Sequence, residues 1–166
     1  MCIRDRHLTG VLKAAAAHRG SSLVEIYQNC PIFNDDAFAA VKDRETSADA
    51  IIPLTHGQPI RFGTDGHLGV TRDPRTGEFR VVEVAEVGEA ALAVHDAHLA
   101  DPSYAFGLSR LTDAGVLHRA PIGVFRDVEA PAYDDLAREQ IELARGHGDA
   151  EAVSYTHLTL PTTPYV

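Results

Sequence analysis

Apolar side chains recur along the chain at two spacings, which predict helices at both ends and short strands between them. Residues 7–18 carry an apolar stripe at helical spacing, and Gly20 provides a glycine stop just after it. Residues 23–27 form a nearly continuous apolar run, which is typical of a strand buried on both faces. Helix, glycine and strand in this order predict one αβ step of a parallel sheet whose neighbouring strands come from other sequence.

The middle of the chain is predicted to hold short elements separated by turns. The run Asn-Asp-Asp at residues 34–36 is expected to cap a helix over residues 37–42 with its side-chain oxygens. Residues 51–55 and 59–62 are predicted strands on either side of a His-Gly-Gln turn.

A hairpin and several helices are predicted in the second half. Residues 67–72 pair with residues 78–84 across an Asp-Pro-Arg-Thr-Gly loop, and Phe79 and Val81 supply the packing face. The remaining patterns predict a helix over residues 86–100, a helical turn or two over 103–111, extended chain over 116–125, and an amphipathic helix over 131–145.

Composition indicates a globular domain and excludes some partners. The 166 residues are 45% hydrophobic and 23% charged, and the net charge of -9 argues against nucleic acid and anionic membranes as partners. No apolar run approaches the roughly 20 residues that span a bilayer. With only two cysteines no disulfide framework is implied, and a reducing, cytoplasmic setting fits this cysteine usage.

Both ends of the chain look foreign to the rest. Residues 1–6 and residues 153–157 can be encoded by strings that are nearly reverse complements of each other, and they resemble the transposon end used in sequencing libraries. We expect residues 1–6 and 153–166 to be adaptor sequence, and we exclude them from the fold. The natural part would then be residues 7–152, beginning within a domain.

Cys30 is the most conspicuous candidate for chemistry. It directly follows the predicted strand and precedes a proline, and ligands of open α/β sheets bind beyond the carboxyl ends of strands. A buried, unreactive thiol, a nucleophile and a metal ligand all remain open for this position. A nucleophile lacks a nearby base in the sequence, and neither zinc nor an iron–sulfur cluster finds enough ligands at short spacing.

A second candidate is the pair His95 and His98. On a helix over residues 86–100 their imidazoles would lie at i, i+3 and could share a metal, although no third ligand is in register. A solvated helix face is the alternative interpretation.

Three motifs carry a resemblance to a known family. The stretch SLVEIYQNCPIFN at residues 22–34 resembles the β subunit of the 2-oxoacid:ferredoxin oxidoreductases, particularly the 2-oxoglutarate type. The stretches AFGLSR at residues 105–110 and PIGVFRD at residues 121–127 resemble its C-terminal extension, as does the Ile-Pro-Leu segment at residues 52–54 with its hairpin. The resemblance covers residues 7–151.

The resemblance implies a fold and a domain division. The fold class is α/β: residues 7–34 would end a thiamine-diphosphate-binding domain with one αβ step. Residues 35–152 would form a small α+β extension with a hairpin and C-terminal helices.

The resemblance also implies an activity and its cofactors. Such enzymes convert a 2-oxoacid to acyl-coenzyme A on thiamine diphosphate and Mg²⁺, and pass electrons through a [4Fe–4S] cluster to ferredoxin. The β subunit works with an α subunit. Cys30 matches the fourth cluster ligand of this family, and Asn29, Pro31 and Phe33 would shape the shell of the cluster.

The chain departs from the family pattern in two motifs. The Cys-x-x-Cys pair and the Gly-Asp-Gly magnesium element are absent, so the catalytic residues are expected upstream, and this chain should hold no cofactor and be inert alone. The alternatives are a pyruvate or other 2-oxoacid relative, and a non-catalytic module that packs on a partner subunit with Cys30 buried.

Overall fold

The computed structural model describes residues 3–112 and 117–146, with side chains from residue 6 onward. It divides into two compact units, and each is described by itself. Among the described helices, none combines the length and the apolar character needed to cross a bilayer. The first unit comprises residues 1–17 and 23–128, and the second comprises residues 18–22 and 129–166.

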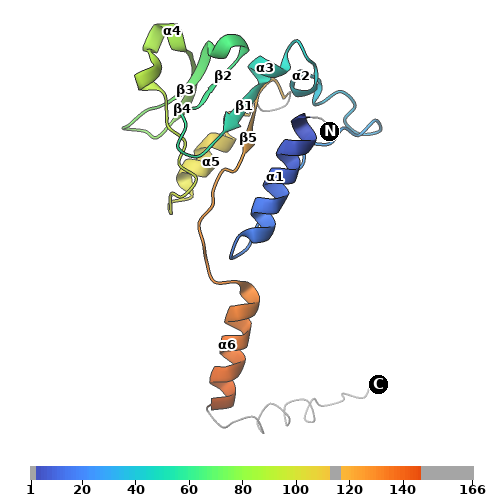
Figure 1. Ribbon diagram of the computed structural model, residues 1–166, viewed down its shortest axis with the longest axis vertical. Helices are drawn as coiled ribbons and strands as arrows, with labels where there is room; N and C mark the ends of the chain where they lie inside the picture. The colour runs from blue at the N-terminus through green and yellow to red at the C-terminus, as the bar shows by residue number, and fades with distance from the viewer. Residues whose placement is uncertain (1–2, 113–116, 147–166) are drawn as a thin grey trace, which may run out of the picture. The chain divides into compact units, whose positions relative to one another are not determined.

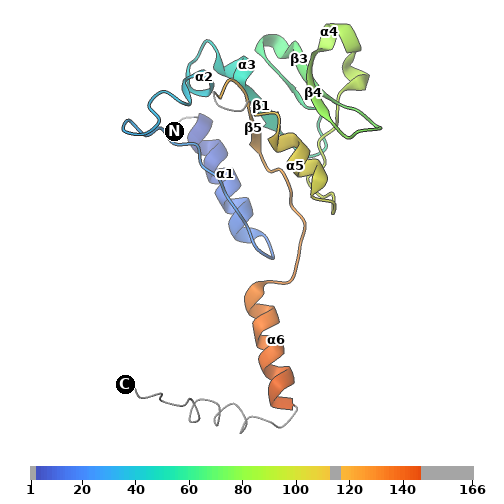
Figure 2. The same cartoon turned by 180° about the vertical axis from the view of Figure 1, so that it is seen from behind.

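A two-stranded parallel sheet joins distant parts of the first unit. Strand β1 (Ile51–Leu54) pairs with β5 (Ala120–Gly123), and the two lie side by side in Figures 1 and 2. In β1 the side chains alternate, because Ile52 and Leu54 are buried while Pro53 faces solvent. Both strands were expected as short extended segments, and β1 ends one residue before the predicted boundary.

A three-stranded antiparallel sheet contains the predicted hairpin. Its strand order is β2 (Arg61–Phe62), β3 (Leu68–Arg72) and β4 (Phe79–Glu83). The Asp73 carboxylate accepts hydrogen bonds from the amides of Arg75 at 2.7 Å and Thr76 at 3.0 Å, which folds the loop between β3 and β4. The predicted hairpin is therefore confirmed.

The core of the first unit lies between these sheets and α5 (Ser103–Ser109). Helix α5 buries Tyr104 and Leu108, and Phe79 of β4 packs edge to face on the Tyr104 ring at 5.3 Å between centroids. The predicted packing role of Phe79 and Val81 is confirmed, since Phe79 is buried and Val81 packs against the core. The core consists of Ile52, Leu54, Ile60, Phe62, Leu68, Val70, Phe79, Tyr104 and Leu108.

The predicted helix over residues 86–100 is wrong. Helix α4 (Val84–Val87) ends at Gly88, whose φ of 78° leaves the helical region, and a single 3₁₀ turn follows over Glu89–Ala91. The chain beyond it is extended: the Ile60 amide donates to the Ala93 carbonyl at 2.9 Å, and Ala93 donates to Val70 at 2.7 Å. The apolar spacing in this segment therefore reflects packing against the hairpin sheet rather than helical periodicity.

The predicted strand over residues 23–27 is absent from the described structure. This segment has no strand partner there, and Leu23 is 95% exposed. A strand is defined by the hydrogen bonds to its neighbours, so an apolar run without a neighbouring strand remains irregular. The αβ step expected for the first part of the chain thus consists only of its helix, α1 (Ile3–Ala17).

The predicted cap at residues 34–36 is also wrong. Helix α2 (Ala39–Lys42) begins after Phe38, which makes no side-chain capping bond. The polar run instead belongs to a turn that precedes the helix. The remaining short helices of the first unit are α3 (Ser47–Ala50) and a 3₁₀ turn, η1 (Thr64–Gly66).

The second unit contains the predicted C-terminal helix, α6 (Tyr133–Gly146), and this prediction is confirmed. Its first turn carries Asp134 and Asp135, whose charges complement the positive end of the helix dipole. Arg19 contacts the Asp135 carboxylate at 3.5 Å and accepts a hydrogen bond at its carbonyl from the Ala130 amide.

Candidate functional site

Cys30 lies in a tight turn closed by Asn34. The Asn34 amide donates to the Cys30 carbonyl at 2.9 Å, and the Cys30 amide donates to the Asn34 side-chain oxygen at 2.8 Å. Proline at position 31 cannot continue a strand, so the chain turns directly after the cysteine. Asn34 was expected to cap a helix, and its side chain instead fixes the backbone that carries the thiol.

The turn directs backbone amides at the thiol. Hydrogen bonds from the amides of Phe33, Ile32 and Asn34 lower the pKa of the Cys30 thiol below its ordinary value. Cys30 as a whole residue is half-buried. A cysteine whose pKa is lowered is present as thiolate to a greater extent near neutral pH, and the thiolate is the form that binds metals and acts as a nucleophile.

The predicted neighbours of Cys30 differ in what they do. Asn29 braces the turn, because its side chain donates to Asp35 at 3.0 Å and accepts from the Asp36 amide at 3.1 Å. Pro31 is exposed, and Phe33 is 89% exposed. A side chain with that exposure covers nothing within the described residues.

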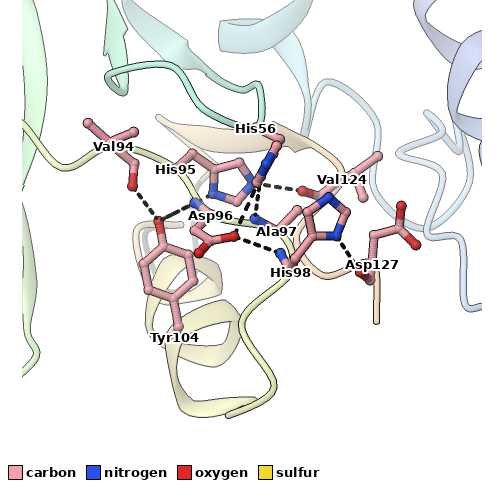
Figure 3. Close-up of polar contacts among 9 residues, drawn as sticks. All are labelled: His56, Val94, His95, Asp96, Ala97, His98, Tyr104, Val124 and Asp127. Atoms are coloured by element: carbon pink, nitrogen blue, oxygen red, sulfur yellow. Dashed lines mark hydrogen bonds and ion pairs between the residues drawn. The ribbon is translucent and has the colours of Figure 1, made fainter. Parts of the chain in front are cut away.

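A second polar cluster surrounds His95 and was not predicted as a unit (Figure 3). His95 is fully buried, and its Nε2 lies 2.8 Å from the Val124 carbonyl oxygen. A carbonyl only accepts, so Nε2 carries the proton, and Nδ1 is free to accept from the Tyr104 hydroxyl at 3.3 Å. Burial lowers the pKa of His95, because the charged imidazolium is poorly solvated there.

The predicted geometry of the His95 and His98 pair is wrong. The two residues lie on extended chain and a turn, and their rings point to different partners (Figure 3). His98 Nδ1 lies 2.7 Å from the Asp127 carbonyl oxygen and therefore donates to it. The described residues contain no group of three side chains that could hold a metal ion.

His56 and Asp96 complete the exposed side of this cluster. His56 Nδ1 accepts a hydrogen bond from the Ala97 amide at 3.2 Å and lies 3.5 Å from an Asp96 carboxylate oxygen. The His56 and His98 rings meet edge to face at 4.3 Å. Because Nδ1 accepts from an amide, the proton of the neutral ring sits on Nε2, and that nitrogen has no lone pair for a metal.

These two sites differ in chemical character. The His95 cluster joins the loop at residues 56–58, the start of α5 and the end of β5, and its buried polar groups are paired with one another. Such a paired network stabilises and specifies a fold. The Cys30 turn instead holds a half-buried cysteine whose pKa is lowered by the backbone amides of the turn, so it is the stronger candidate for binding. The sequence signal for the Tyr104 role was weak, since a lone tyrosine in a short helix is ordinary core.

Comparison with known proteins identifies a relative. The chain is 46% identical over 142 residues to the 2-oxoglutarate oxidoreductase subunit KorB of Mycobacterium tuberculosis. The chain is a homologue of KorB. The alignment covers 85% of the chain and 37% of KorB, so the chain spans little more than a third of that relative.

The KorB match confirms the resemblance to the 2-oxoglutarate oxidoreductases that the motifs at residues 22–34, 105–110 and 121–127 indicated. No protein-family profile and no solved structure matches the chain. The α/β class is confirmed by the parallel and antiparallel sheets of the first unit.

Proposed function

We propose that the chain is the C-terminal part of the β subunit of a 2-oxoacid:ferredoxin oxidoreductase that acts on 2-oxoglutarate. The identity to KorB is the observation that carries this proposal. Residues 7–34 would end the thiamine-diphosphate-binding domain, residues 35–152 would form its extension, and residues 1–6 and 153–166 would not belong to it. The complete enzyme, with its α subunit, would convert the 2-oxoacid and coenzyme A to acyl-coenzyme A and reduce ferredoxin in the cytoplasm.

Cys30 is proposed as one ligand of the iron–sulfur cluster. The turn closed by Asn34 supports this role, because amide hydrogen bonds favour the thiolate, which is the form that binds iron. Hydrogen bonds to ligand sulfur also help to set the potential of a cluster. Asn29 would hold the turn, while Pro31 and Phe33 would contact the shell contributed by the remainder of the subunit.

This chain by itself does not fit a complete cofactor site. A [4Fe–4S] cluster takes four thiolates, and the whole chain has two cysteines. The other cluster ligands, and the residues for thiamine diphosphate and Mg²⁺, would come from the part of the subunit that matches the rest of KorB. When bound, these groups would supply carbanion stabilisation and one-electron transfer. We therefore expect the chain alone to show no 2-oxoacid-dependent reduction of a viologen dye.

A chimera tests the proposal. Residues 7–152 replace the aligned segment of KorB, and the hybrid is assembled with the other subunits of its complex. We expect 2-oxoglutarate-dependent viologen reduction and a normal iron content. Cys30→Ser should lose both, whereas Gln28→Ala, two positions away and outside the turn, should keep both.

The outcomes separate the alternatives. An inactive chimera with full iron content would contradict the 2-oxoglutarate assignment, and activity with pyruvate in its place would point to the other substrate class. Unchanged iron in Cys30→Ser would contradict the ligand role of the cysteine. Dye reduction by the isolated chain would contradict the proposal that its activity depends on the remainder of the subunit.

A further inference from the structure

The loop that carries His56 is hydrogen-bonded to the extended segment after α4. The Gly57 amide donates to the His95 carbonyl at 2.8 Å, and the His95 amide donates to the Gln58 carbonyl at 2.9 Å. A side chain adds to these backbone bonds, because His56 Nδ1 accepts from the Ala97 amide at 3.2 Å (Figure 3). The backbone bonds persist at any pH near neutrality, whereas the His56 bond depends on a lone pair that a proton removes.

Asp96 offers the same nitrogen of His56 a second partner. An Asp96 carboxylate oxygen lies 3.5 Å from His56 Nδ1. A neutral Nδ1 carries a lone pair and suits the Ala97 amide, but a protonated Nδ1 carries a hydrogen that opposes this amide and attracts the carboxylate. The His56 and Asp96 side chains are 50% and 45% exposed, so protons from solvent reach them. The two protonation states therefore favour different partners.

Two other titratable rings lie near His56. The His98 ring meets it edge to face at 4.3 Å, and the buried His95 ring interacts with it electrostatically. A charge on either ring opposes a charge on His56, while the Asp96 carboxylate favours one. Protonation of His98 breaks none of its bonds, because its Nδ1 already donates to the Asp127 carbonyl. His56 differs, because its Nδ1 accepts.

Ala97 connects the His56 contact to the chain that follows β5. Ala97 is 3% exposed, and its carbonyl accepts from the Asp127 amide at 2.7 Å. Arg126 holds the same stretch by donating to the Ala100 carbonyl at 3.0 Å. A buried amide without an acceptor is unfavourable, so we expect Ala97 to move when His56 no longer accepts from it. The Asp127 contact then weakens.

We propose that His56 is a pH-sensitive latch within the first unit. Neutral His56 holds the Ala97 amide. Protonated His56 releases this amide and pairs with Asp96, which loosens the hold of Ala97 on Asp127. The proton comes from solvent and binds at Nδ1, while Nε2 keeps its own. The switch needs no cofactor and is independent of the enzymatic proposal.

NMR spectroscopy of the full 166-residue chain follows the latch residue by residue. The series runs from about pH 8 to about pH 5, the range in which histidine titrates. On acidification the Ala97 amide resonance should shift with the same midpoint as the His56 ring. The hydrogen-exchange protection of the Ala97 and Asp127 amides should fall several-fold relative to that of the Val70 amide. Val70 is fully buried and donates to a hairpin-sheet neighbour, so it reports global unfolding.

Three variants separate the latch from other effects of pH. His56→Gln keeps an oxygen that accepts from the Ala97 amide but cannot titrate, so both amides should stay protected throughout. Asp96→Asn keeps an oxygen for the His98 amide and removes the charge that receives the protonated ring, so the transition should move to lower pH. His67→Gln is the matched control, because His67 Nδ1 lies 2.8 Å from a carbonyl oxygen and donates in both states. It should leave the Ala97 profile unchanged.

Four results would overturn the proposal. An Ala97 amide that is unchanged across the series would exclude the release. The same change in His56→Gln would assign it to His95 or His98. An Asp127 amide that keeps its protection relative to Val70 would exclude the coupling to the chain after β5. A transition in Asp96→Asn at the original pH would exclude the carboxylate as the second partner.

Discussion

His95 donates its Nε2 proton to the Val124 carbonyl oxygen at 2.8 Å, although 29 residues separate the two in the chain (Figure 3). The bond ties the extended segment after α4 to the end of β5. The His95 ring is fully buried, and its hydrogen-bond partners are the Val124 carbonyl and the Tyr104 hydroxyl. Burial disfavours the charged ring and lowers the pKa of His95, so we expect the fold to be sensitive to pH.

Acidification should destabilise the first unit through His95. The folded state lowers the pKa of His95 below its ordinary value of 6.5, chiefly by burial, so the unfolded chain binds more protons below that pH. The free energy of unfolding should therefore fall as pH drops below about 6.5. Urea unfolding at pH 7.5 and pH 5.5 measures this change. In His95→Gln the stability should depend less on pH, and an unchanged dependence would exclude His95 as its source.

Removing the Tyr104 hydroxyl should destabilise the same network. The hydroxyl donates to His95 Nδ1 and accepts from the Asp96 amide, each at 3.3 Å. Neither hydrogen bond can form in Tyr104→Phe. We expect a loss of about 1–2 kcal/mol in the free energy of unfolding. Tyr133→Phe removes the hydroxyl of a tyrosine that is 82% exposed and should change the stability by less than about 0.5 kcal/mol. Equal effects of the two substitutions in urea unfolding would contradict the network.

The sequence predicted the elements whose patterns are local. The hairpin follows from Asp73 and Gly77 between two β-rich runs, and α6 follows from a clean amphipathic period. The segment after Gly88 shows why the rest failed: its apolar spacing fits a helix, but the backbone bonds to Ile60 and Val70 decide its conformation. Such long-range pairing leaves no local signal.

The candidate site was predictable only in part, because only some of its features leave a local signal in the sequence. Cys30 was conspicuous because a proline follows it directly, and the structure adds the amide bonds that polarise the thiol. The role of Asn34 in closing that turn competes with helix capping, and both roles use the same side-chain oxygen. The His95 cluster depends on Tyr104 and Val124, which only the tertiary fold brings together.

Alanine at Gly123 should destabilise the parallel sheet. Gly123 has a φ of 145° and lies opposite Leu54, whose carbonyl oxygen and Cβ occupy the space that a side chain would need. Gly123→Ala therefore combines backbone strain with a clash against backbone atoms, and we expect a loss of about 3 kcal/mol or more. Gly57→Ala is the matched control, because its φ is 76° and nothing lies within 4 Å of an added Cβ. Gly57→Ala should lower the free energy of unfolding by about 1–2 kcal/mol. A loss at Gly57 larger than the loss at Gly123 would show that the contact with Leu54 is not decisive.

The Cys30 thiol should react faster than an unperturbed cysteine. Its pKa is lowered by the amides of the turn, first of all that of Phe33, so a larger fraction is thiolate near neutral pH. Iodoacetamide labelling across pH, in a Cys2→Ser background that leaves one thiol, measures the pKa directly.

The same labelling experiment shows whether the turn is the cause. Asn34→Ala removes the oxygen that accepts from the Cys30 amide at 2.8 Å, so the turn should loosen and the pKa of the thiol should rise toward its ordinary value. Gln28→Ala lies outside the turn and should leave the labelling profile in place. A profile that is unaffected by Asn34→Ala would mean that the amides of Ile32 and Phe33 are held by the backbone alone. The lowered pKa would then be a property of the Cys-Pro segment rather than of the Asn34 closure.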